Sequence, residues 1–221
     1  MNKITSCMRN NRGVGAGGAN TNKYGKQFEE LTDNSLNLLN LGFKATPIHQ
    51  VGSPGSLNIK QKIKQSTCLS WESGQVTVSF VVQHGLKQFM KARYDKHLFR
   101  CPDEAYIIYC KATEITTIYI LEKKEQHVEG SAETKLWSGP SLKREYQLVL
   151  FEDHFVVHYG FCVSDFLKTK LTSTAPKYVC LNKIFAENDI KCLYGNDPDY
   201  FTRLHLWWTT PICDTIAAEG R

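Results

Sequence analysis

The chain has 221 residues, of which 42% are hydrophobic, and this length and composition suit one globular α/β domain with a sizeable core. Its 27 basic and 22 acidic residues leave a formal net charge of +5, a mild surplus that a DNA-binding protein would concentrate on one surface but that identifies no partner by itself. No run of about twenty apolar residues is present, which excludes a membrane-spanning helix, and the start of the chain lacks the apolar core of a secretory signal.

A flexible N-terminal arm is predicted for residues 1–21, which are rich in Gly, Asn and basic residues. The glycine run at residues 13–18 follows no strand and precedes no Gly-Lys-Ser/Thr, so a flexible leader is favoured over a nucleotide-binding loop. The spacing of Phe28 and the leucines over residues 22–41 predicts an amphipathic helix that stops at Gly42.

The middle of the chain predicts mainly strands. Residues 45–75 carry turn signals, including Gly-Ser-Pro-Gly-Ser, and are expected to be rich in loops. Alternating Val and Phe at residues 76–82 predict a half-buried strand, and residues 86–94 predict a short helix. Two short runs rich in β-branched and aromatic residues, 104–109 and 116–124, predict two further strands.

Helices and strands alternate in the remainder. Residues 131–150 predict helical structure interrupted by a Ser-Gly-Pro sequence, and residues 155–162 predict a strand followed by a helix at residues 164–171. Residues 178–181 and 191–194 are predicted to be further strands. Strands that alternate with helices after a central meander predict an α/β fold in which a central mixed β-sheet is flanked by helices.

Charged residues mark the ends of the two central predicted strands. Asp103 directly precedes one strand, and Glu122 and Lys124 lie at the end of the next, so adjacent pairing would bring the three side chains together. Because successive residues of a strand point to opposite faces, Glu122, Lys124 and Gln126 share the face of Ile120. Two carboxylates and an ammonium at one point favour a divalent cation such as Mg²⁺ and metal-assisted phosphodiester hydrolysis. The alternative is a set of ordinary solvated charges at strand ends.

These residues resemble the active-site elements of the PD-(D/E)XK nuclease superfamily, and within it of the type II restriction endonucleases. Residues 100–107, Arg-Cys-Pro-Asp-Glu-Ala-Tyr-Ile, are similar to the first element, and residues 120–126, Ile-Leu-Glu-Lys-Lys-Glu-Gln, are similar to the second. Residues 128–146 are similar to the helix that follows the catalytic strand, and residues 21–29 are loosely similar to an N-terminal helix that contributes a glutamate. The resemblance is good over residues 100–146 and suggestive over residues 20–33.

The resemblance implies a restriction-endonuclease-like fold and a site for Mg²⁺. It implies Asp103 and Glu122 as metal ligands, the backbone carbonyl of Lys123 as a third ligand, and Lys124 as the residue beside the attacking water. Residues 22–221 would then form a single catalytic endonuclease domain.

The resemblance implies auxiliary roles for Glu29 and Gln126. The chain departs from the family pattern in the extra charges of Glu104, Lys123 and Glu125, and a register in which Glu104 takes part in the site stays open.

The expected function is therefore that of a Mg²⁺-dependent type II restriction endonuclease, which cleaves double-stranded DNA at a short specific sequence and leaves a 5′-phosphate. A palindromic target would imply a homodimer. DNA contacts are expected from Asn20 and Lys23 near the arm and from Lys135, Lys143 and Arg144 on the polar surface of the helical region that follows the motif.

Two alternatives remain at this point. One is a repair or nicking nuclease with the same fold, and the other is a non-catalytic nucleic-acid-binding protein in which Asp103, Glu122 and Lys124 form a structural ion-pair cluster. The eight cysteines are scattered without Cys-x-x-Cys or zinc-type spacing, so reduced thiols and a cytoplasmic location are expected, with no membrane partner. The pair Trp207–Trp208 is expected to serve the core or a dimer contact in preference to base stacking.

Overall fold

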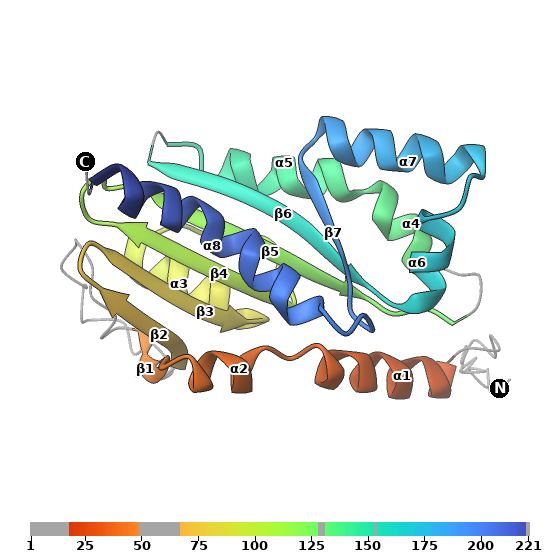
Figure 1. Cartoon of the computed structure of the whole chain (residues 1–221), viewed down its shortest axis with the longest axis horizontal. Coiled ribbons are helices and arrows are strands. Elements are labelled where there is room, and N and C mark those ends of the chain that lie inside the picture. Colours follow the sequence, from red (N-terminus) through yellow and green to blue (C-terminus); the bar gives the residue numbers. More distant parts are fainter. Residues whose placement is uncertain (1–17, 49–66, 128–130, 153, 220–221) are drawn as a thin grey trace, which may run out of the picture.

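A seven-stranded β-sheet, in which the strands follow one another in sequence order, organises the protein (Figure 1). The structure is a computed structural model that describes residues 18–48, 67–127, 131–152 and 154–219. The strands are β1 (Lys44–Pro47), β2 (Thr67–Ser73), β3 (Val76–Val82), β4 (Glu104–Cys110), β5 (Thr116–Lys124), β6 (Phe155–Val163) and β7 (Ile190–Tyr194). Pairing is antiparallel from β1 through β5 and parallel from β5 through β7. The predicted mixed sheet is confirmed.

Helices cover both faces of this sheet. They are α1 (Gly18–Leu31), α2 (Ser35–Asn40), α3 (His84–Tyr94), α4 (Ser131–Trp137), α5 (Gly139–Val149), α6 (Asp165–Leu171), α7 (Pro176–Glu187) and α8 (Tyr200–Glu219). Helices α3 to α7 pack into one hydrophobic cluster, and α1, α2 and α8 pack into a second cluster on the opposite face (Figure 1). None of the helices in the described ranges is long and apolar enough to cross a membrane.

The two-residue period of β4 and β5 produces these two clusters. Ala105 and Ile107 face α3 to α7, whereas Tyr106 and Ile108 face the other helices. In β5, Ile118 and Ile120 belong to the first cluster, while Tyr119 and Leu121 belong to the second. Because both faces are covered, these strands are nearly continuously apolar in sequence.

The predicted helix over residues 22–41 is wrong in one respect, since two helices occupy this region. Thr32 donates its hydroxyl to the carbonyl of Phe28, and the Asp33 carboxylate accepts hydrogen bonds from the amide and hydroxyl of Ser35. Such local side-chain bonds compete with helical backbone bonds and end α1 before α2 starts.

The strand predicted at residues 178–181 is also wrong, because these residues lie within α7. A four-residue apolar run does not distinguish a strand from a buried helix face, and Pro176 in the first turn favours the helix. The loop-rich prediction for residues 45–75 missed β2 and most of β1, and residues 49–66 lie outside the described residues.

The other predicted strands and helices are confirmed, and Trp208 lies in the core. Of the predicted arm, residues 1–17 lie outside the described residues, and Gly18 begins α1. Cys68, Cys101, Cys162, Cys180 and Cys192 form no disulfide bond.

Gly195 fixes the distance between α1 and the end of β7, and a methyl group there should destabilise the protein. A Cβ at this position would lie 2.6 Å from Phe28 Cζ and 2.7 Å from Thr32 Cγ2. We expect Gly195→Ala to lower the free energy of unfolding by about 1–3 kcal/mol through overpacking, measured by urea denaturation. Gly25→Ala, whose Cβ would meet nothing within 4 Å, is the control and should raise stability by about 0.5–1 kcal/mol through helix propensity. Equal effects of the two substitutions would contradict this account.

Candidate functional site

The pairing of β4 with β5 places the charged ends of the two strands side by side. Glu104 lies opposite Leu121, so Asp103, one residue earlier, comes next to the level of Glu122. Lys123 donates its backbone amide to Asp103 Oδ2 at 2.6 Å. This bond fixes the aspartate at the end of β5, as the sequence predicted.

Three oxygen atoms converge on the ammonium group of Lys124. The distances to Nζ are 2.6 Å from Glu122 Oε2, 3.1 Å from the backbone carbonyl of Lys123 and 3.6 Å from Asp103 Oδ2. The three residues that the resemblance implied as metal ligands therefore lie around one point. The side chains of Lys124, Glu122 and Asp103 are 13%, 16% and 27% exposed, so solvent reaches all three.

This oxygen set fits a hard divalent cation. Two carboxylates and a backbone carbonyl already surround a positively charged group, and Mg²⁺ characteristically takes one or two protein carboxylates and completes its shell with water and substrate phosphate. Within the described residues no group of three or more His, Cys, Asp and Glu side chains could hold a metal ion, so a cation here would depend on the Lys123 carbonyl and on non-protein oxygens.

Burial controls the electrostatics of Glu122. It raises the pKa of this carboxyl group, Lys124 opposes the increase, and Asp103 adds to it. The charge of the exposed Lys135 also acts to lower the pKa of Glu122. Burial raises the pKa of Tyr146 and Tyr159, and the charge of Glu122 is the next largest cause in both.

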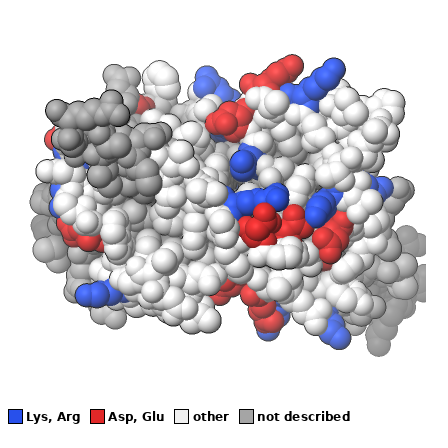
Figure 2. Space-filling view, in the orientation of Figure 1, with Lys and Arg blue, Asp and Glu red and all other residues white. Residues whose placement is uncertain are grey.

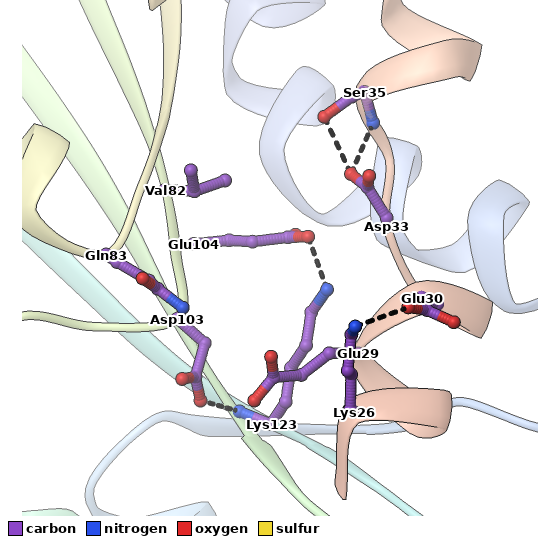
Figure 3. Close-up of a pocket in the computed structure, with 10 residues that line it drawn as sticks. All are labelled: Lys26, Glu29, Glu30, Asp33, Ser35, Val82, Gln83, Asp103, Glu104 and Lys123. Carbon is purple, nitrogen blue, oxygen red and sulfur yellow. Dashed lines mark hydrogen bonds and ion pairs between the residues drawn. The ribbon is translucent and has the colours of Figure 1, made fainter. Parts of the chain in front are cut away.

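Glu104 and Lys123 form a second charged pair, on the opposite face of the same strands. Lys123 Nζ lies 2.5 Å from Glu104 Oε1 (Figure 3). It also donates to the carbonyl of Thr32 at 3.0 Å. The two side chains are only 5% and 2% exposed. Glu104 therefore does not join Glu122 and Lys124, and the register that included it in the site is not the one observed.

A chain of buried hydrogen bonds extends from Glu104 to α8. Tyr106 donates its hydroxyl to Glu104 Oε2 at 3.2 Å and accepts from Asn34 Nδ2 at 3.0 Å. His205 Nε2 donates to Asn34 Oδ1 at 3.0 Å. The break between α1 and α2 is thereby bound to the sheet and to α8.

A cavity of about 270 Å³ lies between α1 and the strand ends (Figure 3). The residues that line it are Lys26, Glu29, Glu30, Asp33, Ser35, Val82, Gln83, Asp103, Glu104 and Lys123. Glu29, predicted as an auxiliary residue, thus faces the same cavity as Asp103. Glu29 belongs to α1, so only the folded chain brings it there.

Gln126 has a structural environment. Its side-chain Oε1 accepts the amide of Glu133 at 2.9 Å, and its backbone exchanges hydrogen bonds with the hydroxyl of Ser164. Gln126 is 7% exposed and holds the start of α4. Its predicted auxiliary role is not tested by these contacts.

The predicted DNA-contacting residues differ in exposure. Lys23, Lys135 and Arg144 are exposed, and the side chain of Asn20 lies outside the described residues. Lys143 does not lie on the polar surface as predicted: it is buried, and its ammonium donates to the carbonyls of Asn188 and Asp189 at 2.8 and 2.9 Å. A polar position on a helix does not reveal carbonyl groups that another segment brings to it.

The pairing of Glu104 with Lys123 was not predicted from the sequence. The alternation of side chains offers a signal, since Lys123 shares the face of Leu121, the residue opposite Glu104. On the face in Figure 2, acidic and basic side chains are intermixed, so the +5 surplus is not concentrated into one basic patch there.

Acidification should weaken the fold through His205. Burial lowers the pKa of this histidine, so the folded state binds fewer protons than the unfolded state, and stability falls as the pH drops below about 6.5. We expect His205→Gln, which can still donate to Asn34, to show a shallower loss of unfolding free energy between pH 7.5 and pH 5 in urea titrations. A comparison at pH 8, where histidine is neutral in both states, gives the cost of the substitution itself. If His205→Gln loses unfolding free energy between pH 7.5 and pH 5 as steeply as the wild type, His205 is not the source of the acid sensitivity.

Comparison with known proteins gives weak similarities. No protein-family model matches the sequence, and no curated protein matches it. Among solved structures, an XisH family protein from Nostoc punctiforme PCC 73102 is 14% identical, with a TM-score of 0.29 over 76% of this chain and 88% of that chain. The MunI restriction endonuclease in complex with cognate DNA is 16% identical, with a TM-score of 0.26 over 49% of this chain and 58% of that chain. These values assign no activity to this chain.

Proposed function

We propose that this protein is a Mg²⁺-dependent nuclease that hydrolyses the phosphodiester bonds of DNA. The observation that carries the proposal is the convergence of Asp103 Oδ2, Glu122 Oε2 and the Lys123 carbonyl on one cationic group at the ends of β4 and β5. The resemblance of the surrounding sequence to the PD-(D/E)XK pattern supports the same chemistry.

Each residue has a distinct role in this proposal. Asp103, Glu122 and the carbonyl of Lys123 would hold Mg²⁺, which supplies Lewis-acid chemistry and a more acidic bound water. Lys123 orients the Asp103 carboxylate through its backbone amide. Lys124, whose ammonium lies 2.6 Å from Glu122, would leave this carboxylate as the cation enters, orient the attacking water and stabilise negative charge that develops on the phosphate.

The finer proposal is a type II restriction endonuclease that cleaves double-stranded DNA at a short specific sequence and leaves a 5′-phosphate. A palindromic target would require a homodimer, because each subunit of a two-fold pair would cut one strand. The resemblance to restriction enzymes supports this assignment, and a cytoplasmic location accords with it.

A structural ion-pair cluster in a nucleic-acid-binding protein is the second candidate. The contact between Lys124 and Glu122 favours it, because the ammonium already satisfies this partly buried carboxylate without any metal. The two candidates differ in whether Asp103, Glu122 and Lys124 are needed for DNA cleavage or only for stability.

Plasmid or phage DNA incubated with the protein and Mg²⁺ tests the proposal. We expect discrete double-stranded fragments, and we expect Asp103→Asn, Glu122→Gln and Lys124→Met each to reduce cleavage by at least about 10²–10³-fold while DNA binding is largely retained, since each removes charge from the reacting centre. EDTA should abolish cleavage, and gel electrophoresis provides the measurement.

The controls separate the alternatives. Lys111→Ala, which removes a lysine paired with Glu72 at the opposite end of the β4–β5 hairpin, should cut like the wild type. Nicked circles would favour a nicking or repair nuclease, and DNA that stays intact would favour the structural ion-pair cluster. A fully active Asp103→Asn enzyme would show that the site lies elsewhere.

DNA binding should depend on Lys135. This exposed lysine belongs to α4, and its positive charge acts on the Glu122 carboxyl group, so we expect it to attract a phosphate bound at the site. We expect Lys135→Ala to weaken DNA binding and to reduce the slope of log K against log salt by about one, because one phosphate contact and its released counterion are lost. Fluorescence anisotropy at several salt concentrations measures the slope. Lys111→Ala is again the control, and equal slopes for the two variants would contradict the contact.

A further inference from the structure

Lys123 belongs to two environments at once. Its backbone lies in the proposed site, where the amide donates to Asp103 Oδ2 and the carbonyl accepts from Lys124 Nζ. Its side chain leaves the opposite face of the sheet and ends in the buried pair with Glu104 (Figure 3). The side chain of Lys123, on one face of the sheet, therefore restrains the backbone amide and carbonyl that Lys123 contributes to the proposed site.

The pair is bound at several points. Lys123 Nζ also donates to the carbonyl of Thr32, which lies just after the end of α1. The second oxygen of Glu104 accepts from the hydroxyl of Tyr106, which in turn accepts from Asn34. Thr32, Asn34, Glu104 and Tyr106 are each at most 1% exposed. Such a closed set of hydrogen bonds restricts the positions that the end of β5 can adopt.

We propose that the buried Glu104–Lys123 pair is a positioning device, which holds the amide and carbonyl of Lys123 in register with Asp103 and Glu122. Lys123 and Glu104 are thus positioning residues, and neither side chain touches the cation or the substrate. The proposal rests on the proposed nuclease function and extends it to residues that the PD-(D/E)XK resemblance left unexplained.

Stability and positioning separate when both charges are removed together. Removal of one partner leaves a buried charge without its counter-ion and destabilises strongly, whereas replacement of both by neutral groups of similar shape is often neutral for stability. The double variant Glu104→Gln/Lys123→Met therefore tests positioning with the least effect on folding.

We expect the double variant to unfold near the wild-type urea midpoint but to bind Mn²⁺ about 10–100-fold more weakly in titration calorimetry without DNA, the usual cost of losing support behind a metal ligand. With Mg²⁺, kcat should fall by a similar factor while KM for DNA changes little. Lys168→Met is the matched control, because it removes a lysine of α6 that is paired with Asp197. This variant should retain wild-type Mn²⁺ affinity.

Two further measurements keep the test independent of folding and of activity. Tyr106→Phe, which leaves both charges in place but removes the hydroxyl bonded to Glu104, should give a smaller loss of Mn²⁺ affinity in the same direction. In the metal-free protein, the proton NMR signal of the backbone amide at position 123 should move upfield in the double variant, because its 2.6 Å bond to Asp103 loosens.

Wild-type Mn²⁺ affinity and an unmoved amide signal in the folded double variant would overturn the positioning role. If that variant does not fold, wild-type affinity and an unmoved amide signal in Tyr106→Phe would overturn it. A wild-type protein that binds no Mn²⁺, while the amide signal still moves in the double variant, would contradict the nuclease function and support the anchoring of Lys123.

Discussion

The register between β4 and β5 is the constraint on which the site depends. Glu104 opposite Leu121 brings Asp103 to the end of β5, and the alternation of side chains then sends Glu122 and Lys124 to one face and Lys123 to the other. A slip of one residue would exchange the two faces and bury the wrong charges. The same hydrogen bonds that build the sheet therefore decide which charged groups solvent can reach.

The position of β5 within the sheet explains why the site forms at this end. The strand pairs antiparallel with β4 and parallel with β6, so its carboxyl end lies at the same edge as the carboxyl ends of β6 and β7. The amide of Ser164, directly after β6, donates to the carbonyl of Lys124 at 3.2 Å. In β6, Tyr159 lies opposite Ile120 and Phe161 lies opposite Glu122, and both rings are fully buried. Burial also raises the pKa of Glu122 itself. The charged end of β5 therefore adjoins a buried aromatic part of the core.

The alternation of side chains along a strand was sufficient to predict part of the site. Alternation within β5 correctly assigned Glu122 and Lys124 to one face, because that relation depends only on the two-residue period of a strand. The role of Asn34 was not predictable in this way, since its partners Tyr106 and His205 are 72 and 171 residues away. The predicted exposure of Lys143 was wrong for the same reason, because its carbonyl partners come from the segment between α7 and β7. Periodicity reports which face a residue takes, and it does not report what another segment places there.

The two groups of charges at the ends of β4 and β5 differ in their exposure to solvent, and this difference determines the role that each group can have. Glu104 and Lys123 are only 2% and 5% exposed at the wall of the cavity against α1, and each charge is balanced by its partner. Glu122, Lys124 and Asp103 keep contact with solvent, and the ammonium that balances the carboxylates there is carried on a flexible side chain that can move. A cation can therefore compete with Lys124 for the same oxygens more readily than with Lys123, whose ammonium group is less exposed. The nearly buried pair is therefore suited to support the end of β5, and the more exposed cluster is suited to bind a cation.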